Sequence, residues 1–201
     1  VNKGLAIQAF MNEAPFAGRL PVFAGDDVTD EAGFAVVQRL GGAGIKVGAG
    51  TSCALHRCDN PETLRAWQRD SATKALTAHL QLARAEAIKT SRMIVVCPSA
   101  NGTACTGNTD WKGGWIVFSD DDKDQAVDAS ERIVAVKGAI TGISTMTSSD
   151  SVDALVFLPN GLLGEGATTV TITPNGGSPK KINKVTLSIA GRPIVKTETT
   201  S

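Results

Sequence analysis

The feature that most constrains how this chain can fold is a change of residue pattern near Arg69. Before it, short apolar runs alternate with segments of helical periodicity, as in α/β proteins. After it, one amphipathic helix is followed by a series of short strands separated by turns, which indicates an α+β fold. The 201 residues therefore divide into two expected domains, 1–69 and 70–201.

In the first domain, residues 20–25 form a short apolar run that ends in Gly-Asp-Asp, which predicts a buried strand opening into a polar loop. Residues 30–40 have helical periodicity after an acidic start. Consecutive glycines end this helix, and residues 45–47 predict a second strand. Residues 61–68 predict a last short helix.

In the second domain, residues 71–90 have the clearest helical pattern of the chain, and Ser71 is the expected N-cap. The apolar face of this helix consists of Leu76, Leu80, Ala83 and Ala87, with Ile88 beside it. Six strands are expected after the helix, at residues 92–97, 114–119, 132–137, 154–158, 168–173 and 185–189.

Twenty basic and twenty acidic residues cancel, so no field of the whole chain favours nucleic acid or a membrane as partner. The charges are unevenly spread, however, which leaves room for a local partner. Acidic residues gather at 26–31 and 120–128, and basic residues at 180–196. No run approaches the roughly 20 apolar residues that span a bilayer. The chain begins with Val and shows no signal peptide, so we expect a fragment of a longer protein.

Four cysteines form two local pairs, and neither pair has the CxxC spacing of a zinc or redox site. Cys97 and Cys105 flank a loop rich in Gly, Ser, Asn and Thr, which a disulfide between them would close. Such a bond implies an oxidising compartment. Trp111 and Trp115 follow closely, and we interpret them as core residues near this bond. A stacking platform for bases or sugars is the alternative.

Three carboxylates, those of Asp26, Asp27 and Asp30, lie within five positions directly after the expected strand at 20–25. Such carboxylates repel one another unless a cation lies among them, and Mg²⁺ prefers oxygen ligands. A lysine nearby, such as Lys3, would offset the charge of a phosphate. A solvated acidic turn that caps the next helix is the alternative interpretation.

The acidic loop and its flanks resemble the C-terminal end of trehalose-phosphatase, which belongs to the haloacid-dehalogenase-like superfamily. The resemblance covers residues 1–67 and is carried by Lys3-Gly4 and by residues 14–19, 25–34 and 46–48. It implies that the first domain is an incomplete α/β haloacid-dehalogenase-like fragment, with a cytoplasmic parent enzyme.

The same resemblance implies roles for individual residues. Lys3 would contact the phosphate and the phosphorylated aspartate, and Asp26, with Asp27 and Asp30 in support, would hold Mg²⁺. The family's nucleophilic aspartate lies in a DxD motif on an earlier strand, and no such motif precedes Lys3 here. Because half of the site cannot form the covalent aspartyl-phosphate, we expect these residues to be vestigial and the chain to have no phosphatase activity.

The second domain resembles the GspH/FimT family of pilin-like proteins. The resemblance is carried by residues 80–89, Cys97-Pro98-Ser99, Cys105, residues 114–118 and Gly191-Arg192. It implies an amphipathic helix packed on antiparallel β-sheets. The family's strongly hydrophobic N-terminal helix should run straight into residues 71–90, but the phosphatase-like fragment takes its place. The chain is therefore interpreted as a chimera.

Some members of the FimT type bind DNA for uptake through basic residues of a C-terminal Gly-Arg motif. The resemblance implies weak, salt-sensitive DNA binding here by the basic residues of the C-terminal stretch. These are Arg192, Lys196, Lys184, Lys181 and Lys180. A solvated final strand is the alternative interpretation.

Taken together, the residues and resemblances predict a non-enzymatic minor pilin or pseudopilin of a type IV pilus or type II secretion system. Its partners would be other pilin or pseudopilin subunits, and its parent would lie in the pilus, in the periplasm or anchored to the inner membrane. This pilin-like half is expected to need no cofactor. The alternative function is that of a Mg²⁺-dependent trehalose-6-phosphate phosphatase.

Overall fold

The computed structural model describes residues 2–14, 16–164, 166–178 and 180–200. The chain divides into two compact units, Val1–Leu64 and Arg65–Ser201, which are described separately. The division falls five residues before the end of the predicted first domain at residue 69.

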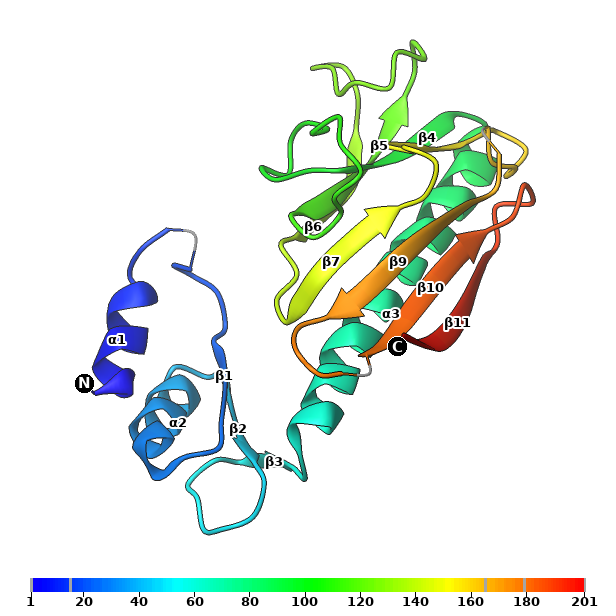
Figure 1. The fold of residues 1–201 in the computed structure, drawn as a ribbon. Helices are drawn as coiled ribbons and strands as arrows, with labels where there is room; N and C mark the ends of the chain where they lie inside the picture. The colour runs from blue at the N-terminus through cyan, green and yellow to red at the C-terminus, as the bar shows by residue number, and fades with distance from the viewer. Residues whose placement is uncertain (1, 15, 165, 179, 201) are drawn as a thin grey trace. The chain divides into compact units, whose positions relative to one another are not determined.

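The first unit is a small α/β unit whose three strands are parallel and ordered β1-β2-β3 (Figure 1). Its elements are α1 (Lys3–Phe10), β1 (Val22–Gly25), the 3₁₀ helix η1 (Val28–Asp30), α2 (Glu31–Arg39), β2 (Ala43–Val47) and β3 (His56–Cys58). The predicted strands and the predicted helix at 30–40 are thereby confirmed, whereas α1 and β3 had no clear signal in the sequence.

Close packing of α2 on the sheet depends on a glycine. A Cβ atom at Gly33 would lie 2.5 Å from the ring of Phe23, so only glycine lets this strand residue reach the helix. Phe23 also packs against Phe34, with ring centroids 5.5 Å apart. Beyond this small core, β1 is an edge strand, and Val22 is 68% exposed.

A single helix, α3 (Pro61–Thr90), replaces the two helices predicted at 61–68 and 71–90. The prediction that Ser71 caps a separate helix was wrong, because no proline or glycine follows Pro61 to interrupt the helical hydrogen bonds. Asn60 instead marks the start, where its side-chain oxygen accepts hydrogen bonds from the backbone N–H and the hydroxyl of Thr63.

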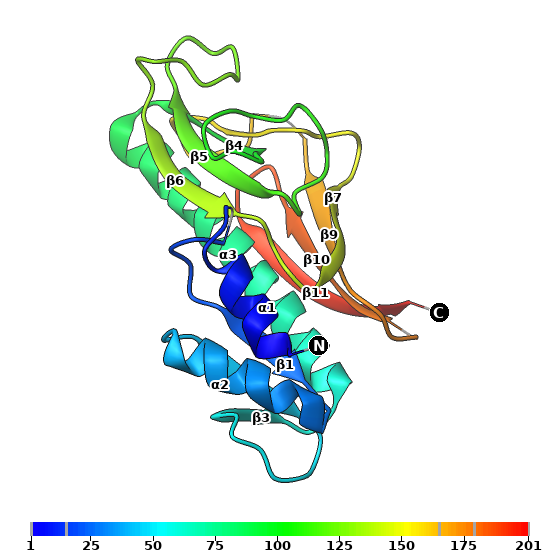
Figure 2. The same ribbon diagram turned by 90° about the vertical axis from the view of Figure 1, so that its left-hand side faces the viewer.

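The second unit places α3 against two four-stranded sheets, in which every described pair of neighbouring strands is antiparallel (Figures 1 and 2). One sheet has the order β6-β5-β4-β8 and the other β11-β10-β9-β7. The strands are β4 (Met93–Pro98), β5 (Gly114–Asp120), β6 (Ile133–Gly138), β7 (Ile143–Ser148), β8 (Leu155–Phe157), β9 (Thr168–Pro174), β10 (Lys180–Leu187) and β11 (Pro193–Thr200).

All six predicted strands of this unit are present, although β10 begins five residues earlier than expected. β7 was not predicted, since Ser and Thr dominate it and its alternation is weak. β11 corresponds to the solvated final strand that was the alternative interpretation of the C-terminal stretch, and most of its residues are exposed.

The predicted apolar face of α3 is buried against both sheets. Leu76, Leu80, Ala83 and Ala87 are fully buried there, whereas Ile88, expected beside them, is exposed. Residues of β4, β5, β7, β8, β9 and β10 complete this core. A second, smaller core lies around alternate residues of the same β4–β5 pair, including Val95, Cys97, Ile116 and Phe118. All seven residues of β5 are therefore buried.

The helix is joined to β5 by a hydrogen bond at the margin of the core. The indole Nε1–H of Trp115 donates to Nδ1 of His79 over 2.8 Å, so Nδ1 must be unprotonated. Burial, together with the charge of Lys137, lowers the pKa of His79.

We predict that acid destabilises the second unit through His79. A lowered pKa in the folded state means that the unfolded chain binds the proton more readily, so stability is retained above about pH 6.5 and decreases as the pH falls further. His79→Gln keeps an acceptor that does not titrate and should remove this part of the pH dependence. His79→Phe should cost about 1–3 kcal/mol at pH 7, because the indole N–H loses its partner. Chemical unfolding between pH 5 and 8 measures both; an unchanged pH slope in His79→Gln would contradict the assignment.

Candidate functional site

Lys3, the predicted phosphate-binding residue, forms an ion pair with the buried carboxylate of Asp30, with 2.5 Å between Nζ and Oδ1. The N–H of Gly4 donates to the side chain of Asn2, which caps α1. Gly4 lets α1 approach α2, since a Cβ there would lie 2.6 Å from the carbonyl oxygen of Ala32. The ammonium group lowers the pKa of Asp30 through its hydrogen bond, and the carboxylate raises the pKa of Lys3.

The acidic loop after β1 uses two of its three predicted metal ligands in its own fold. Oδ2 of Asp30 accepts a hydrogen bond from the N–H of Asp27 (3.0 Å), and the side chain of Asp27 accepts one from the backbone of Asp30, which together form a capping box. Oδ1 of Asp27 also accepts from the N–H of Val28 (2.5 Å). Asp26 is exposed, and its carbonyl oxygen accepts from Lys46 Nζ (2.6 Å).

A three-carboxylate magnesium site is therefore not assembled in this loop. Among the described residues, the carboxylates of Asp26, Asp27 and Asp30 do not bring ligand atoms within 4.8 Å of one another. Asp30 is paired with Lys3, and Asp27 caps the helix, as the alternative interpretation proposed. Asp26 remains the carboxylate that fits Mg²⁺, which prefers few protein oxygens and several waters. Its metal role stays a prediction.

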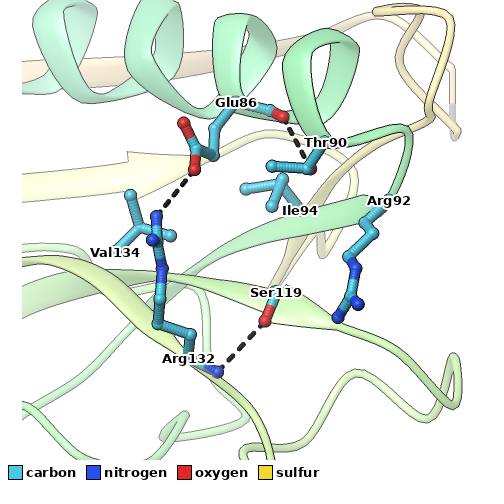
Figure 3. A pocket seen from close by; sticks show the side chains of 7 residues that line it. All are labelled: Glu86, Thr90, Arg92, Ile94, Ser119, Arg132 and Val134. Atoms are coloured by element: carbon cyan, nitrogen blue, oxygen red, sulfur yellow. Dashed lines mark hydrogen bonds and ion pairs between the residues drawn. The ribbon is translucent and has the colours of Figure 1, made fainter.

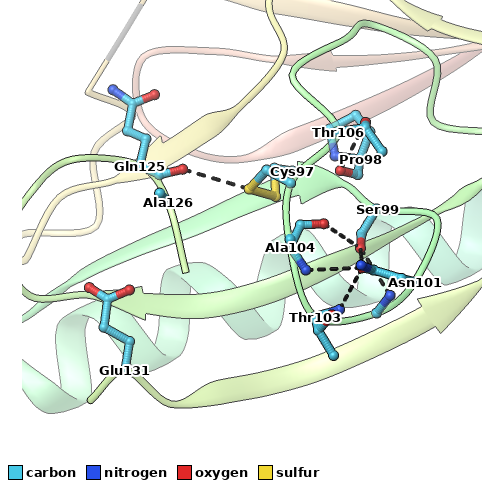
Figure 4. The surroundings of a disulfide bond; sticks show 12 residues. Cys97, Pro98, Ser99, Asn101, Thr103, Ala104, Thr106, Gln125, Ala126 and Glu131 are labelled. Carbon is cyan, nitrogen blue, oxygen red and sulfur yellow. Dashed lines mark hydrogen bonds between the residues drawn. A yellow bond between two sulfur atoms is a disulfide. The ribbon is translucent and has the colours of Figure 1, made fainter. Parts of the chain in front are cut away.

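The disulfide predicted between Cys97 and Cys105 is confirmed (Figure 4). Inside the loop that it closes, Ser99 Oγ donates to the carbonyl of Ala104 (2.6 Å), and Asn101 Oδ1 accepts from the N–H groups of Thr103 and Ala104. Cys53 and Cys58 are not bonded to each other. Their thiol pKa values are raised, by the hydrogen bond to Glu31 at Cys53 and by burial at Cys58.

Trp111 and Trp115 are fully buried, as the interpretation of core packing predicts. Trp115 faces α3, and Trp111 belongs to the same core. Because neither ring is accessible, the alternative of a stacking platform for bases or sugars is wrong. The backbone of Trp111 donates to the carbonyl of Met146, which ties the loop before β5 to β7 in the other sheet.

A pocket of about 310 Å³ lies between the end of α3 and the β4–β5–β6 strands (Figure 3). Glu86, buried on α3, accepts from Arg132 Nη2 over 2.6 Å, and the backbone N–H of Arg132 donates to Ser119 Oγ. The second oxygen of Glu86 lies 3.5 Å from Lys89 Nζ. The sequence pattern missed this pair, because a glutamate among alanines of a helix carries no local signal of a partner 46 residues away.

Arg92 also lines this pocket but forms an ion pair with Asp121, in the loop that follows β5. Arg92 and Arg132 are therefore both neutralised by carboxylates. The Glu86–Arg132 ion pair in this pocket connects the helix to the sheet. We assign it no ligand.

The predicted DNA-binding residues do not form one cluster. Arg192 lies beyond the Leu187 end of β10, beside a second pocket of about 350 Å³, whereas Lys180 and Lys181 occupy the opposite end of that strand. Seven residues of strand separate these ends by about 23 Å. Lys184 and Lys196 are direct cross-strand partners between them, and Lys184 pairs with Glu198 (2.7 Å).

The turn that carries Arg192 is held in place by contacts of Gly191 and Arg84. Gly191 has φ = 67°, and a Cβ there would lie 2.6 Å from the carbonyl oxygen of Gly161, so glycine is required. Arg84 of α3 donates to the carbonyl oxygens of Gly161 (3.1 Å) and Ala190 (3.2 Å). Gly191 and Arg84 thus dock this turn on the helix.

The helix on two antiparallel sheets, the disulfide-closed loop and the docked Gly-Arg turn define the second unit as a pilin-like head. Its fold is similar to that of the type IV minor pilin FimU of Pseudomonas aeruginosa, at 21% identity and a TM-score of 0.52 over 69% of this chain and 97% of that one. Residues 72–191 match the family described as type II transport protein GspH. The chain belongs to the GspH family.

A different segment is similar to trehalose-phosphate phosphatases. The identity is 56% over 66 residues with trehalose-6-phosphate phosphatase of Escherichia coli (strain K12), and 50% over 66 residues with the probable enzyme of Sinorhizobium fredii. These matches cover 33% and 32% of this chain, and the chain spans about a quarter of the length of these relatives. The chain therefore joins two segments with unrelated resemblances.

Proposed function

We propose that this chain acts through its second unit as a minor pilin or pseudopilin that assembles with other pilin-like subunits. The observation that carries the proposal is the match of the GspH family to residues 72–191, which lie entirely inside the unit Arg65–Ser201. The family implies extracytoplasmic assembly, in a type IV pilus or a type II secretion system. The disulfide supports this location, since such bonds persist in oxidising compartments.

The outer side of α3 offers a surface for subunit contacts within this proposal. Trp67, Leu82 and Ile88 are exposed on this helix, while its other side is buried in the core. We propose that these side chains contribute to the subunit contact. Within the described residues, the structure contains no helix long and apolar enough to cross a membrane.

The experiment is chemical cross-linking of the chain to pilin and pseudopilin subunits, followed by mass spectrometry. Leu82→Glu, on α3, should reduce the cross-linked product several-fold, because it places a charge in the proposed contact. Leu5→Glu, on α1 of the first unit, is the matched control and should leave the product unchanged; these leucines are 38% and 66% exposed. Loss in Leu5→Glu alone would assign the contact to the first unit.

The alternative function, a Mg²⁺-dependent phosphatase acting on trehalose 6-phosphate, is tested on the same preparation. We propose that residues 1–67 do not perform it alone, because they contain Lys3 and the acidic loop but no DxD motif to supply a nucleophilic aspartate. Release of phosphate from trehalose 6-phosphate in the presence of Mg²⁺ would contradict the non-enzymatic proposal.

We further propose weak DNA binding by Arg192 and Lys196. Both are exposed, and neither forms an ion pair within the described part of the chain, whereas Lys184 is already paired with Glu198. Phosphate contacts of this kind are independent of sequence and weaken with salt. We expect Arg192→Ala with Lys196→Ala to abolish a gel shift seen at low salt, and Lys74→Ala with Lys89→Ala on α3 to preserve it. An unchanged shift in the first double variant would refute this role.

A further inference from the structure

The loop between β5 and β6 brings together three carboxylates that none of the functions discussed above uses. Asp120, Asp122 and Asp124 each present an oxygen atom, and these atoms all lie within 4.8 Å of one another. Six carboxylates and one lysine occupy residues 120–131, so the loop is strongly acidic. We propose that this loop is a binding site for a calcium ion.

An unsatisfied buried carboxylate oxygen is the independent observation that points to a cation. Asp120 is 1% exposed, and its Oδ1 accepts from the N–H of Lys123 (2.7 Å). Its Oδ2 is also buried and has no hydrogen-bond partner among the described residues. Arg92 does not neutralise it, because Arg92 pairs with Asp121. A buried charged oxygen without a partner is costly, and a cation held beside Asp122 and Asp124 would satisfy it.

The spacing of the carboxylates identifies the cation. Counted from Asp120 as position 1, aspartates occupy positions 1, 3, 5 and 9, and Glu131 occupies position 12. These are the side-chain ligand positions of the twelve-residue EF-hand loop, which binds Ca²⁺. Position 6 of that loop is normally glycine, for a sharp turn. Here it is Gln125, which adopts the same left-handed backbone region at φ = 62°.

The glutamate at position 12 already closes the loop. Oε1 of Glu131 accepts from the N–H of Asp121 (2.7 Å), and Oε2 accepts from the N–H of Asp128 (3.1 Å). One carboxylate therefore joins the beginning of the loop to its ninth position. Asp122 and Asp124 each use one oxygen to accept a backbone N–H within the loop, and both side chains are exposed, so they can coordinate a cation together with water.

The rest of the fold holds the loop in place. Val127 packs on the second core, beside Ile116 and Phe118. The sulfur of Cys105 lies 3.6 Å from the carbonyl oxygen of Gln125 (Figure 4). This is a contact rather than a hydrogen bond, because a disulfide sulfur carries no hydrogen. A loop anchored on both sides loses little conformational freedom when it binds an ion. Its carboxylates favour Ca²⁺, which accepts six to eight oxygen ligands in varied geometry, over Mg²⁺, which requires an octahedron.

The test is calorimetric titration of the full chain, freed of metal, with calcium chloride. We expect one Ca²⁺ per chain with a dissociation constant of about 0.1–1 mM, as in extracellular calcium modules. Asp122→Asn with Asp124→Asn should weaken binding by about tenfold or more, and Glu131→Gln should weaken it as well. The aspartate pair is exposed, so these variants keep the fold, which circular dichroism checks.

The matched control is Asp150→Asn with Asp153→Asn, which removes the same charge from the exposed segment before β8. It should leave calcium binding unchanged. Absence of saturable binding to the unaltered chain would overturn the proposal, as would equal loss in the control pair. Magnesium chloride binding as tightly as calcium chloride would overturn the choice of ion. None of these outcomes depends on whether the chain assembles with pilins.

Discussion

The structure of the second unit depends on the burial of β5 on both of its faces. One face, with Trp115 and Val117, packs in the core beneath α3, and the other, with Ile116 and Phe118, packs in the second core. A strand buried on both faces requires other elements of the chain to pack against each face. The helix supplies one, and the disulfide-closed loop together with Val127 of the acidic loop contributes to the other.

This constraint connects features that look unrelated along the chain. The His79–Trp115 hydrogen bond fixes the helix on β5, and the Glu86–Arg132 pair fixes its end on the start of β6. Arg84 holds the turn before β11 on the same helix. The β5–β6 loop leaves the end of this doubly buried strand, and three of its carboxylates converge although two of them are exposed.

Much of this could be predicted from local pattern. The periodicity of Leu76, Leu80, Ala83 and Ala87 identified the buried face of α3, and the polar loop flanked by Cys97 and Cys105 indicated the disulfide. The separate helix capped at Ser71 was wrong because a capping residue is also tolerated inside a helix that nothing interrupts. Partners such as Arg132 for Glu86 and Lys3 for Asp30 depend on tertiary contacts across dozens of residues. The structural roles of Asp27, which caps η1, and of Gly191, which lets its turn approach Gly161, likewise became visible only in the folded chain.

Native-state hydrogen exchange of the full chain tests most directly whether β5 is the centre of this fold. The account predicts that amides of β5 and of its partner β4 exchange last, through global unfolding of the second unit. Amides of β1 and β2, in a unit with a small core and an exposed edge strand, should exchange earlier. Exchange from β5 that is as fast as from β1, or faster than from the exposed β11, would contradict it.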